Sequence, residues 1–172
     1  LTVMPDKLAK AMAIMADVAE NPAFAQEELD RQRDQALDGL RVAYQQPGSV
    51  AGLAAAPVVF GGTAFGHAPQ GTPQSLPRLK PADLAALHTD LFRPDNAILV
   101  LTGDIDPQEG FALAEQAFGG WKAPAAPLPA QPQIAPAAKP RVVGIDIPGT
   151  GQASVNVVKP GVARSDPDYY PG

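Results

Sequence analysis

The sequence has no cysteine and only two histidines, and these absences exclude several kinds of site. Without cysteine, the chain forms no disulfide of its own and offers no thiolate ligand to a metal. No apolar run is long enough to cross a bilayer, and no signal peptide is visible. Positive charge is also scarce. The net charge of −5 and the pI near 4.9 argue against nucleic acid or an anionic membrane as a partner.

The residues that are present suffice for one ordinary domain. With 172 residues, 45% of them hydrophobic, the chain is long enough to build a sizeable core. The opening residues 1–4 resemble the tail of a strand, so we expect the natural N-terminus to lie further upstream. The chain's ends therefore do not set its localisation, and the lack of cysteine fits both cytoplasm and periplasm.

Apolar residues at helical spacing predict two helices in the first quarter of the chain. The first begins near Leu8 and is stopped by Asn21-Pro22. The second covers residues 26–46 and is broken by Pro47-Gly48. Its acidic residues near the start, Glu27, Glu28 and Asp30, are explained most simply by the helix dipole.

The next segment combines a short helix, a long loop and a longer helix. Residues 50–56 are predicted to be helical, with Ser49 as N-cap and Pro57 ending or kinking the helix. Residues 61–77 form a loop rich in glycine, proline and threonine, and loops of this length tend to be functional or well anchored. A helix over residues 81–91 then follows.

The most informative stretch begins at Arg93. A Pro-Asp-Asn turn leads into an apolar run of strand length, Ala97 to Thr102, which Gly103 ends. Asp106 then has the position of an N-cap for a helix over residues 107–118, which Gly119-Gly120 closes. We expect this helix to pack on a sheet that includes Ile98 to Leu101.

The last quarter of the sequence has a different composition. Residues 123–140 are rich in proline and alanine without a period, which indicates an extended, semi-rigid linker. Beyond it, apolar residues alternate on both sides of Pro148-Gly149-Thr150-Gly151, and this pattern predicts a hairpin. A lone hairpin is marginally stable in water. Residues 141–172 are therefore expected to begin a second domain or to lie as a ribbon on the first.

Several phrases, in order along the chain, resemble the M16 (insulinase/pitrilysin-like) family of zinc peptidases. Residues 92–104 are similar to the family's "tyr-x-pro-x-asn-ala-x-leu-x-val-x-Gly-Asp". Further similar phrases lie at residues 21–33, 65–73, 147–153 and 160–164. Together their order and spacing cover nearly the whole chain and identify it as a member of the family.

This resemblance implies a fold and a division into domains. The expected fold class is α+β, a partial M16 metallopeptidase domain of the LuxS/MPP-like type, with helices packed on one face of a mostly antiparallel sheet. Residues 1–122 would be the C-terminal part of a first domain and residues 123–140 the linker. Residues 141–172 would be the first hairpin of a truncated second domain.

The resemblance also implies where zinc ligands should be. The family binds zinc through a His-x-x-Glu-His helix, expected upstream of Leu1, and a Glu on a later helix. The position of that Glu is occupied by Gly39, which has no side-chain ligand. Asp38 is the nearest substitute, but its helical neighbours place it on a polar, solvated face. Gly39 itself is expected to pack closely against a neighbouring element, near Ala36 and Ala43. We therefore expect no zinc ligand and no catalytic residue in this chain.

The remaining candidate residues are expected to be structural. His67 lies in the 61–77 loop, and His88 lies on the apolar face of the 81–91 helix. A lone histidine without a second ligand is seldom a metal site. Trp121 is expected to fill the edge of the core. The resemblance implies a substrate-holding Arg/Tyr pair beyond Gly172, so Arg164 and Tyr169 are not assigned that role.

Three functions stay open on the sequence alone. The first, which the glycine favours, is a non-catalytic half or subunit that pairs with a zinc-bearing M16 half and helps form a chamber for peptide substrates. The second is an active metallopeptidase whose metal helix lies upstream and whose third ligand comes from elsewhere. The third is a structural subunit without proteolysis. All three predict no nucleic acid and no membrane insertion. Zinc would be a cofactor of the family, with none held by this segment.

Overall fold

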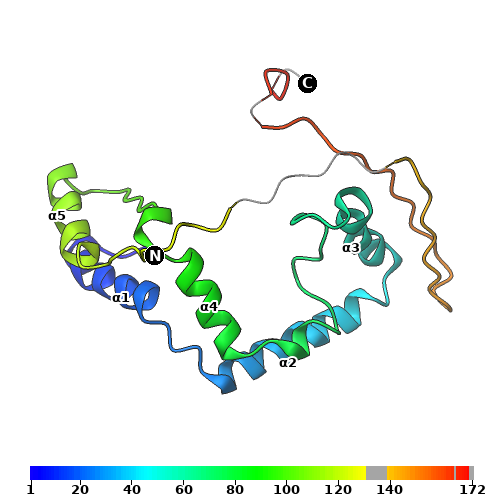
Figure 1. Ribbon diagram of the computed structural model, residues 1–172, viewed down its shortest axis with the longest axis horizontal. Coiled ribbons are helices and arrows are strands. Elements are labelled where there is room, and N and C mark those ends of the chain that lie inside the picture. Colours follow the sequence, from blue (N-terminus) through cyan, green and yellow to red (C-terminus); the bar gives the residue numbers. More distant parts are fainter. Residues whose placement is uncertain (131–138, 165, 171–172) are drawn as a thin grey trace. The chain divides into compact units, whose positions relative to one another are not determined.

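A computed structural model describes residues 1–130, 139–164 and 166–170 (Figure 1). The chain divides into two compact units. Unit 1 combines Leu1–Leu29 with Leu79–Ala130, and unit 2 combines Asp30–Arg78 with the residues after Ala130. The division falls within one helix. The predicted boundaries at residues 122 and 140 follow a different criterion, the resemblance to a family, and stay a prediction.

The regular structure of the described residues is helical. In chain order it comprises η1 (Pro5–Lys7), α1 (Leu8–Glu20), α2 (Gln26–Ala43), α3 (Pro47–Phe60), η2 (Leu76–Arg78), α4 (Pro81–Leu91), η3 (Pro94–Asn96) and α5 (Pro107–Phe118). The predicted helices α1, α2, α4 and α5 are confirmed, although α2 ends three residues earlier than expected. Proline opens α3, α4 and α5, where its missing N–H has no intrahelical partner to lose.

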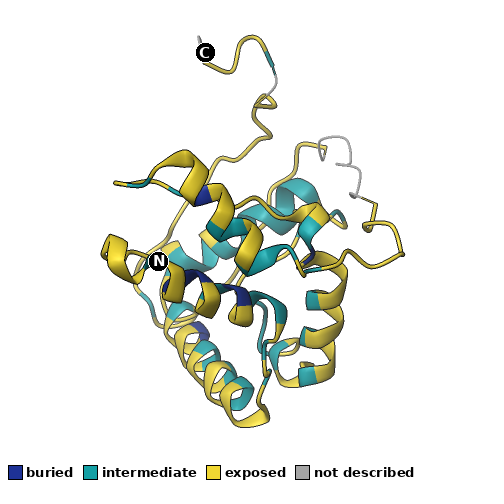
Figure 2. Ribbon diagram, turned by 90° about the vertical axis from the view of Figure 1, so that its left-hand side faces the viewer, coloured by how far each residue is buried: buried dark blue, intermediate teal, exposed yellow. Residues whose placement is uncertain are grey.

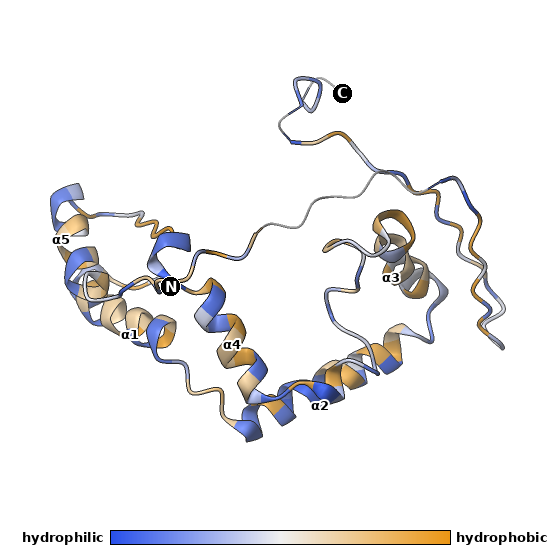
Figure 3. Cartoon of the chain, viewed as in Figure 1, coloured by the Kyte–Doolittle hydropathy of each residue, from blue (hydrophilic) through white to orange (hydrophobic). Residues whose placement is uncertain are grey.

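The third helix is longer than predicted. It begins at Pro47 with Gln46 as N-cap, so Ser49 lies inside the helix and the predicted cap is wrong. Pro57 does not end the helix, which continues to Phe60 and closes with a 3.0 Å hydrogen bond from the Gly61 N–H to the Pro57 carbonyl. The helix has no charged side chain and is coloured largely as apolar in Figure 3.

The expected α+β class, with helices on one face of a mostly antiparallel sheet, is wrong for the described residues. None of them lies in a hydrogen-bonded strand, and Figure 1 contains no arrow. The apolar run at residues 97–102 is neither helix nor strand. Most of its side chains are exposed, and Ile98 is 91% exposed. A strand exists only when a neighbouring backbone completes its hydrogen bonds, and alternation along one segment does not supply that neighbour.

The predicted hairpin forms its turn but not its ladder. Gly149 and Gly151 adopt positive φ angles of 79° and 61°, and the Thr150 hydroxyl donates to the Ile147 carbonyl at 3.2 Å. The two arms are not assigned as strands, and Val157 is 97% exposed. Because the arms bury little apolar surface, little offsets the entropy cost of fixing them.

The core of unit 1 lies along α1. Its buried residues are Ala11, Met12 and Ala16, and α1 packs against α5. Figure 2 shows that most of the ribbon is exposed or half-buried. On α5, Gly110 is buried, and a Cβ built on it would lie 3.4 Å from Leu101 Cδ1. Leu101, the one residue of the 97–102 run that is not exposed, therefore lies against α5, although no sheet forms among the described residues.

Among the described residues of unit 2, the buried apolar residue is Leu40 of α2. The long loop after α3 is anchored, as predicted for a loop of this length. Arg33 Nε donates to the Leu76 carbonyl at 3.2 Å, and Thr72 and Ser75 exchange hydrogen bonds between side chain and backbone. Within the described residues, the helices are too short or too polar to cross a membrane.

Asp106 is the N-cap of α5, as the sequence predicted. Its carboxylate accepts hydrogen bonds from the N–H groups of Gln108 at 2.8 Å and Glu109 at 3.4 Å. Replacing Asp106 with Ala should lower the free energy of unfolding by about 1 kcal/mol, because two N–H groups lose their partner. Denaturant titration followed by the fluorescence of Trp121, the only tryptophan, measures this loss in unit 1. Asp106→Asn, which retains an acceptor, should lose much less. Equal losses in the two variants would contradict the capping role.

Candidate functional site

The position where the family resemblance expects a zinc-binding Glu is open to solvent. Gly39 is exposed on α2, and a Cβ built on it would have no neighbouring atom within 4 Å. The expectation that Gly39 packs closely against another element is therefore wrong. A Cβ would fit here without displacing any described atom. The glycine instead weakens an exposed helix interior by about 1 kcal/mol relative to alanine.

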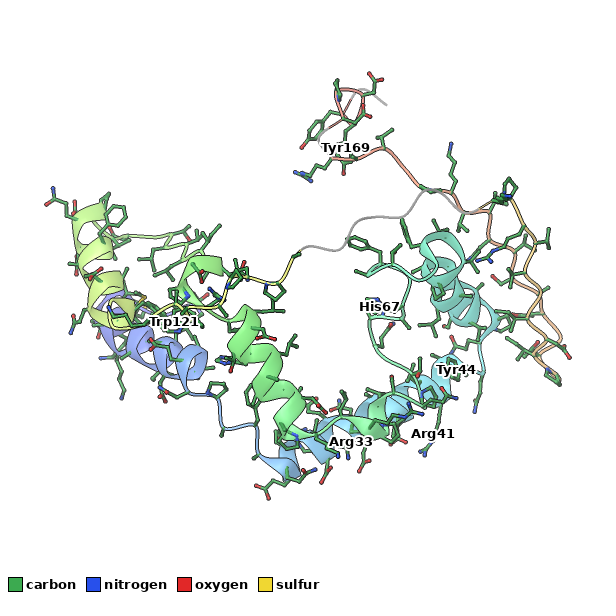
Figure 4. The ribbon with its side chains drawn as sticks, viewed as in Figure 1. Arg33, Arg41, Tyr44, His67, Trp121 and Tyr169 are labelled. Atoms are coloured by element: carbon green, nitrogen blue, oxygen red, sulfur yellow. The ribbon has the colours of Figure 1, made fainter. Side chains whose placement is uncertain are left out.

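Asp38, the nearest carboxylate, is engaged on the helix surface. It forms an ion pair with Arg41 at 2.5 Å, and the two side chains are 70% and 76% exposed. Figure 4 shows Arg41 on the same helix. Pairs with this exposure contribute at most about 1 kcal/mol to stability. The contact fits the solvated face that the sequence predicted for Asp38.

The two histidines lie in different units. His67 is exposed in the loop after α3 in unit 2, as Figure 4 shows, whereas His88 belongs to α4 in unit 1. In the parts of the chain that the structure describes, no three His, Cys, Asp or Glu side chains come together to hold a metal ion. The described residues therefore form no cluster that fits a zinc site, and it stays a prediction that this chain supplies no ligand.

His88 is the centre of an aromatic cluster in unit 1. Its Nε2 lies 2.7 Å from the Ala19 carbonyl, its ring stacks on Phe92 at 5.0 Å, and Phe24 meets it edge-on at 5.7 Å. Phe24 has a positive φ of 43°, which is strained for a bulky side chain. The cluster connects the end of α1, the turn before α2 and the end of α4. This geometry is that of the structural role expected for His88.

Arg93 forms a second cluster, which the sequence analysis missed. Its side chain is almost fully buried, with 3% of the residue exposed. Its Nε and Nη2 donate to the two Asp95 carboxylate oxygens at 2.6 and 2.7 Å, and Nη2 also donates to the Pro124 carbonyl at 3.3 Å. The signal in the sequence was Arg-Pro-Asp, a spacing that lets the guanidinium fold back across the turn.

The Arg93–Asp95 pair has a defined dependence on pH. The hydrogen bond from Arg93 holds the pKa of the Asp95 carboxyl below its ordinary value. Because the folded-state pKa is lowered, the pair stabilises the fold above the pKa of the unfolded carboxyl. That contribution is lost as the pH falls through the lowered pKa.

The structure also places three other groups of residues that the sequence analysis named. Glu27 and Glu28 occupy the first turn of α2, where the helix dipole favours acidic side chains. Trp121 is half-buried and lies 6.2 Å from the Phe118 ring, at the end of α5. Near the end of the described chain, Arg164 lies over the Tyr169 ring at 5.8 Å and donates to the Tyr170 hydroxyl at 3.2 Å.

The fold of the chain is similar to that of two solved structures. A crystal structure of the peptidase M16 inactive domain from Pseudomonas fluorescens has a TM-score of 0.68 and 29% identity, covering 79% of this chain and 32% of that one. The first half of the periplasmic protease PqqL from Escherichia coli has a TM-score of 0.64 at 23% identity, covering 78% of this chain and 29% of that one. The second similarity concerns the fold alone.

Sequence comparison gives the family. The family model described as "Peptidase M16 inactive domain" matches residues 78–172, so the chain belongs to the M16 peptidase family. It is 28% identical over 165 residues to the mitochondrial-processing peptidase subunit beta of Lentinula edodes, covering 94% of this chain. It is also 25% identical over 117 residues to an uncharacterized zinc protease of Mycobacterium leprae (strain TN), covering 68% of this chain.

The chain spans 35% of the length of the Lentinula protein and 26% of the Mycobacterium protein. The resemblance stated from the motifs is confirmed, and zinc is named in the description of one relative. The matched model is that of an inactive domain.

Proposed function

We propose that this chain is part of a non-catalytic half or subunit of an M16 zinc peptidase and helps form the chamber that holds peptide substrates. The observation that carries the proposal is Gly39. It stands at the expected position of the zinc-binding Glu, on an exposed helix face where a carboxylate would fit but none is present. The match to an inactive-domain model supports the same conclusion independently.

The proposal includes a partner and a division of labour. A zinc-bearing M16 half would supply the metal and the attacking water, because three-ligand zinc sites leave a fourth position for water. This chain would contribute surface that positions the peptide, and it would use neither nucleic acid nor membrane insertion. Residues 1–122 would belong to one M16 domain and residues 141–172 to the next, connected by the 123–140 linker.

The chain should bind no zinc tightly, and restoring one carboxylate should not change this. Dialysis followed by metal analysis should find clearly less than one zinc per chain, because a single carboxylate supplies at most one of the three protein ligands that a catalytic zinc requires. Gly39→Glu should behave in the same way, with Gly39→Ala as the matched control for helix stability. Both variants should fold, since the space at Gly39 is open.

Stoichiometric zinc held by the unmodified chain would contradict the proposal. So would zinc that is lost on changing His67 or His88. Binding that appears only in Gly39→Glu would show that the other ligands are already assembled, and it would favour descent from an active enzyme over a site that was never complete.

A further inference from the structure

Arg93 connects the corner after α4 to the first residues of the proline-rich segment. We propose that Arg93 is a latch that fixes Pro124 on unit 1, so that the segment joining the two proposed domains begins after this residue. One guanidinium nitrogen, Nη2, carries both contacts: it donates to Asp95 at 2.7 Å and to the Pro124 carbonyl at 3.3 Å. The side chain is almost completely withdrawn from water.

Asp95 orients the guanidinium for this contact. The two parallel hydrogen bonds to its carboxylate fix the plane of the Arg93 side chain, which leaves Nη2 pointing toward Pro124. Asn96 fixes the same corner, because its side-chain amide donates to the Leu91 carbonyl at 2.9 Å and closes the end of α4. Lysine would keep the charge but lose the planar fork.

The chemistry of the segment explains why a latch of this kind is needed. A proline offers only its carbonyl for hydrogen bonding, and extended proline-rich chain makes no hydrogen bonds of its own. Residues 123–130 contain three prolines and no charged residue, so ion pairs cannot hold them. A buried donor aimed at a carbonyl is one of the few polar contacts that can fix this segment.

The latch would shorten the tether between the two proposed domains. The reach of a linker, and the effective concentration of what it joins, depend on the number of residues free to move. This consequence rests on the proposed division at residues 123–140, whereas the latch itself depends only on contacts inside unit 1.

Limited trypsin digestion of the full protein tests the latch, because Lys122 lies two residues before Pro124. Arg93→Lys should raise cleavage after Lys122 about tenfold relative to cleavage after Lys10 in α1, since cleavage of a protected segment follows its local opening. The substitution itself neither creates nor removes a trypsin site, because residue 93 is followed by Pro94. Mass spectrometry of the early fragments gives both rates.

Two further variants separate a latch from general support of the fold. Asp95→Asn leaves Arg93 in place but weakens its orientation, so it should raise cleavage after Lys122 by a smaller factor. Asp90→Asn removes a carboxylate that acts on Arg93 only through its charge and should leave the ratio unchanged. An unchanged ratio in Arg93→Lys would overturn the latch. Equal increases after Lys122 and Lys10 would also overturn it, by showing that Arg93 only stabilises unit 1. Neither result would bear on the proposed non-catalytic role, because that role rests on Gly39.

Discussion

Mixing the full-length protein with a zinc-bearing M16 partner should raise peptidase activity at least about a hundredfold above that of either protein alone. If the proposed function holds, peptide must be clamped across both halves before the zinc-bound water can attack it. Each half alone then lacks part of the site, since a substrate held out of register by 1 Å can lose about two orders of magnitude in rate. Cleavage of a quenched fluorescent peptide measures the increase.

The controls for this experiment follow from the zinc chemistry. A chelator should abolish the activity of the mixture, and a partner variant lacking one zinc-binding histidine should fail to produce it. Gly39→Glu should show no activity alone. Chelator-sensitive cleavage by the purified protein without any partner would support an active peptidase. A zinc-bearing partner that co-purifies but produces no activity would support a structural subunit.

Replacing His88 with Ala should lower the free energy of unfolding of unit 1 by about 2–4 kcal/mol. The estimate combines one hydrogen bond of about 1 kcal/mol with two ring contacts of about 0.5–1.5 kcal/mol each. All three are lost together, because the ring contacts Phe24 and Phe92 and its Nε2 lies at the Ala19 carbonyl. Denaturant unfolding followed by Trp121 fluorescence measures the loss, since this residue lies in unit 1.

His67→Ala provides the matched control, because His67 is exposed in the loop after α3 and belongs to unit 2. Its effect on the Trp121 transition should be within about 0.5 kcal/mol. A loss below about 0.5 kcal/mol for His88→Ala would mean that the turn around Phe24, despite its positive φ, is held by other contacts.

Local signals in the sequence were sufficient for four of the five α-helices of the described residues, although not for every helix end. Periodicity predicted α1, α2, α4 and α5, and the position of Asp106 as N-cap was confirmed by its two hydrogen bonds, because a cap depends on residues within one turn of each other. The α3 boundary was wrong because a proline at the first helical position was taken as a break. The motifs identified the family because they depend on residue identity and order.

Contacts between distant residues could not be predicted in this way. Whether the 97–102 run becomes a strand depends on a neighbouring backbone, which its alternation does not specify. The Ala19 contact of His88 and the Pro124 contact of Arg93 join residues 69 and 31 positions apart. The surroundings of Gly39 were predicted incorrectly for the same reason.

The sequence by itself therefore determined four of the five α-helices, the N-cap at Asp106, the turn at residues 148–151, the family and the absence of a carboxylate at position 39. Only the tertiary structure decided that Gly39 faces solvent and that Arg93 is buried against Pro124. The physical reason is that helix capping and helical periodicity act over about four residues. Burial and cross-chain hydrogen bonds instead depend on which segments meet once the chain has folded.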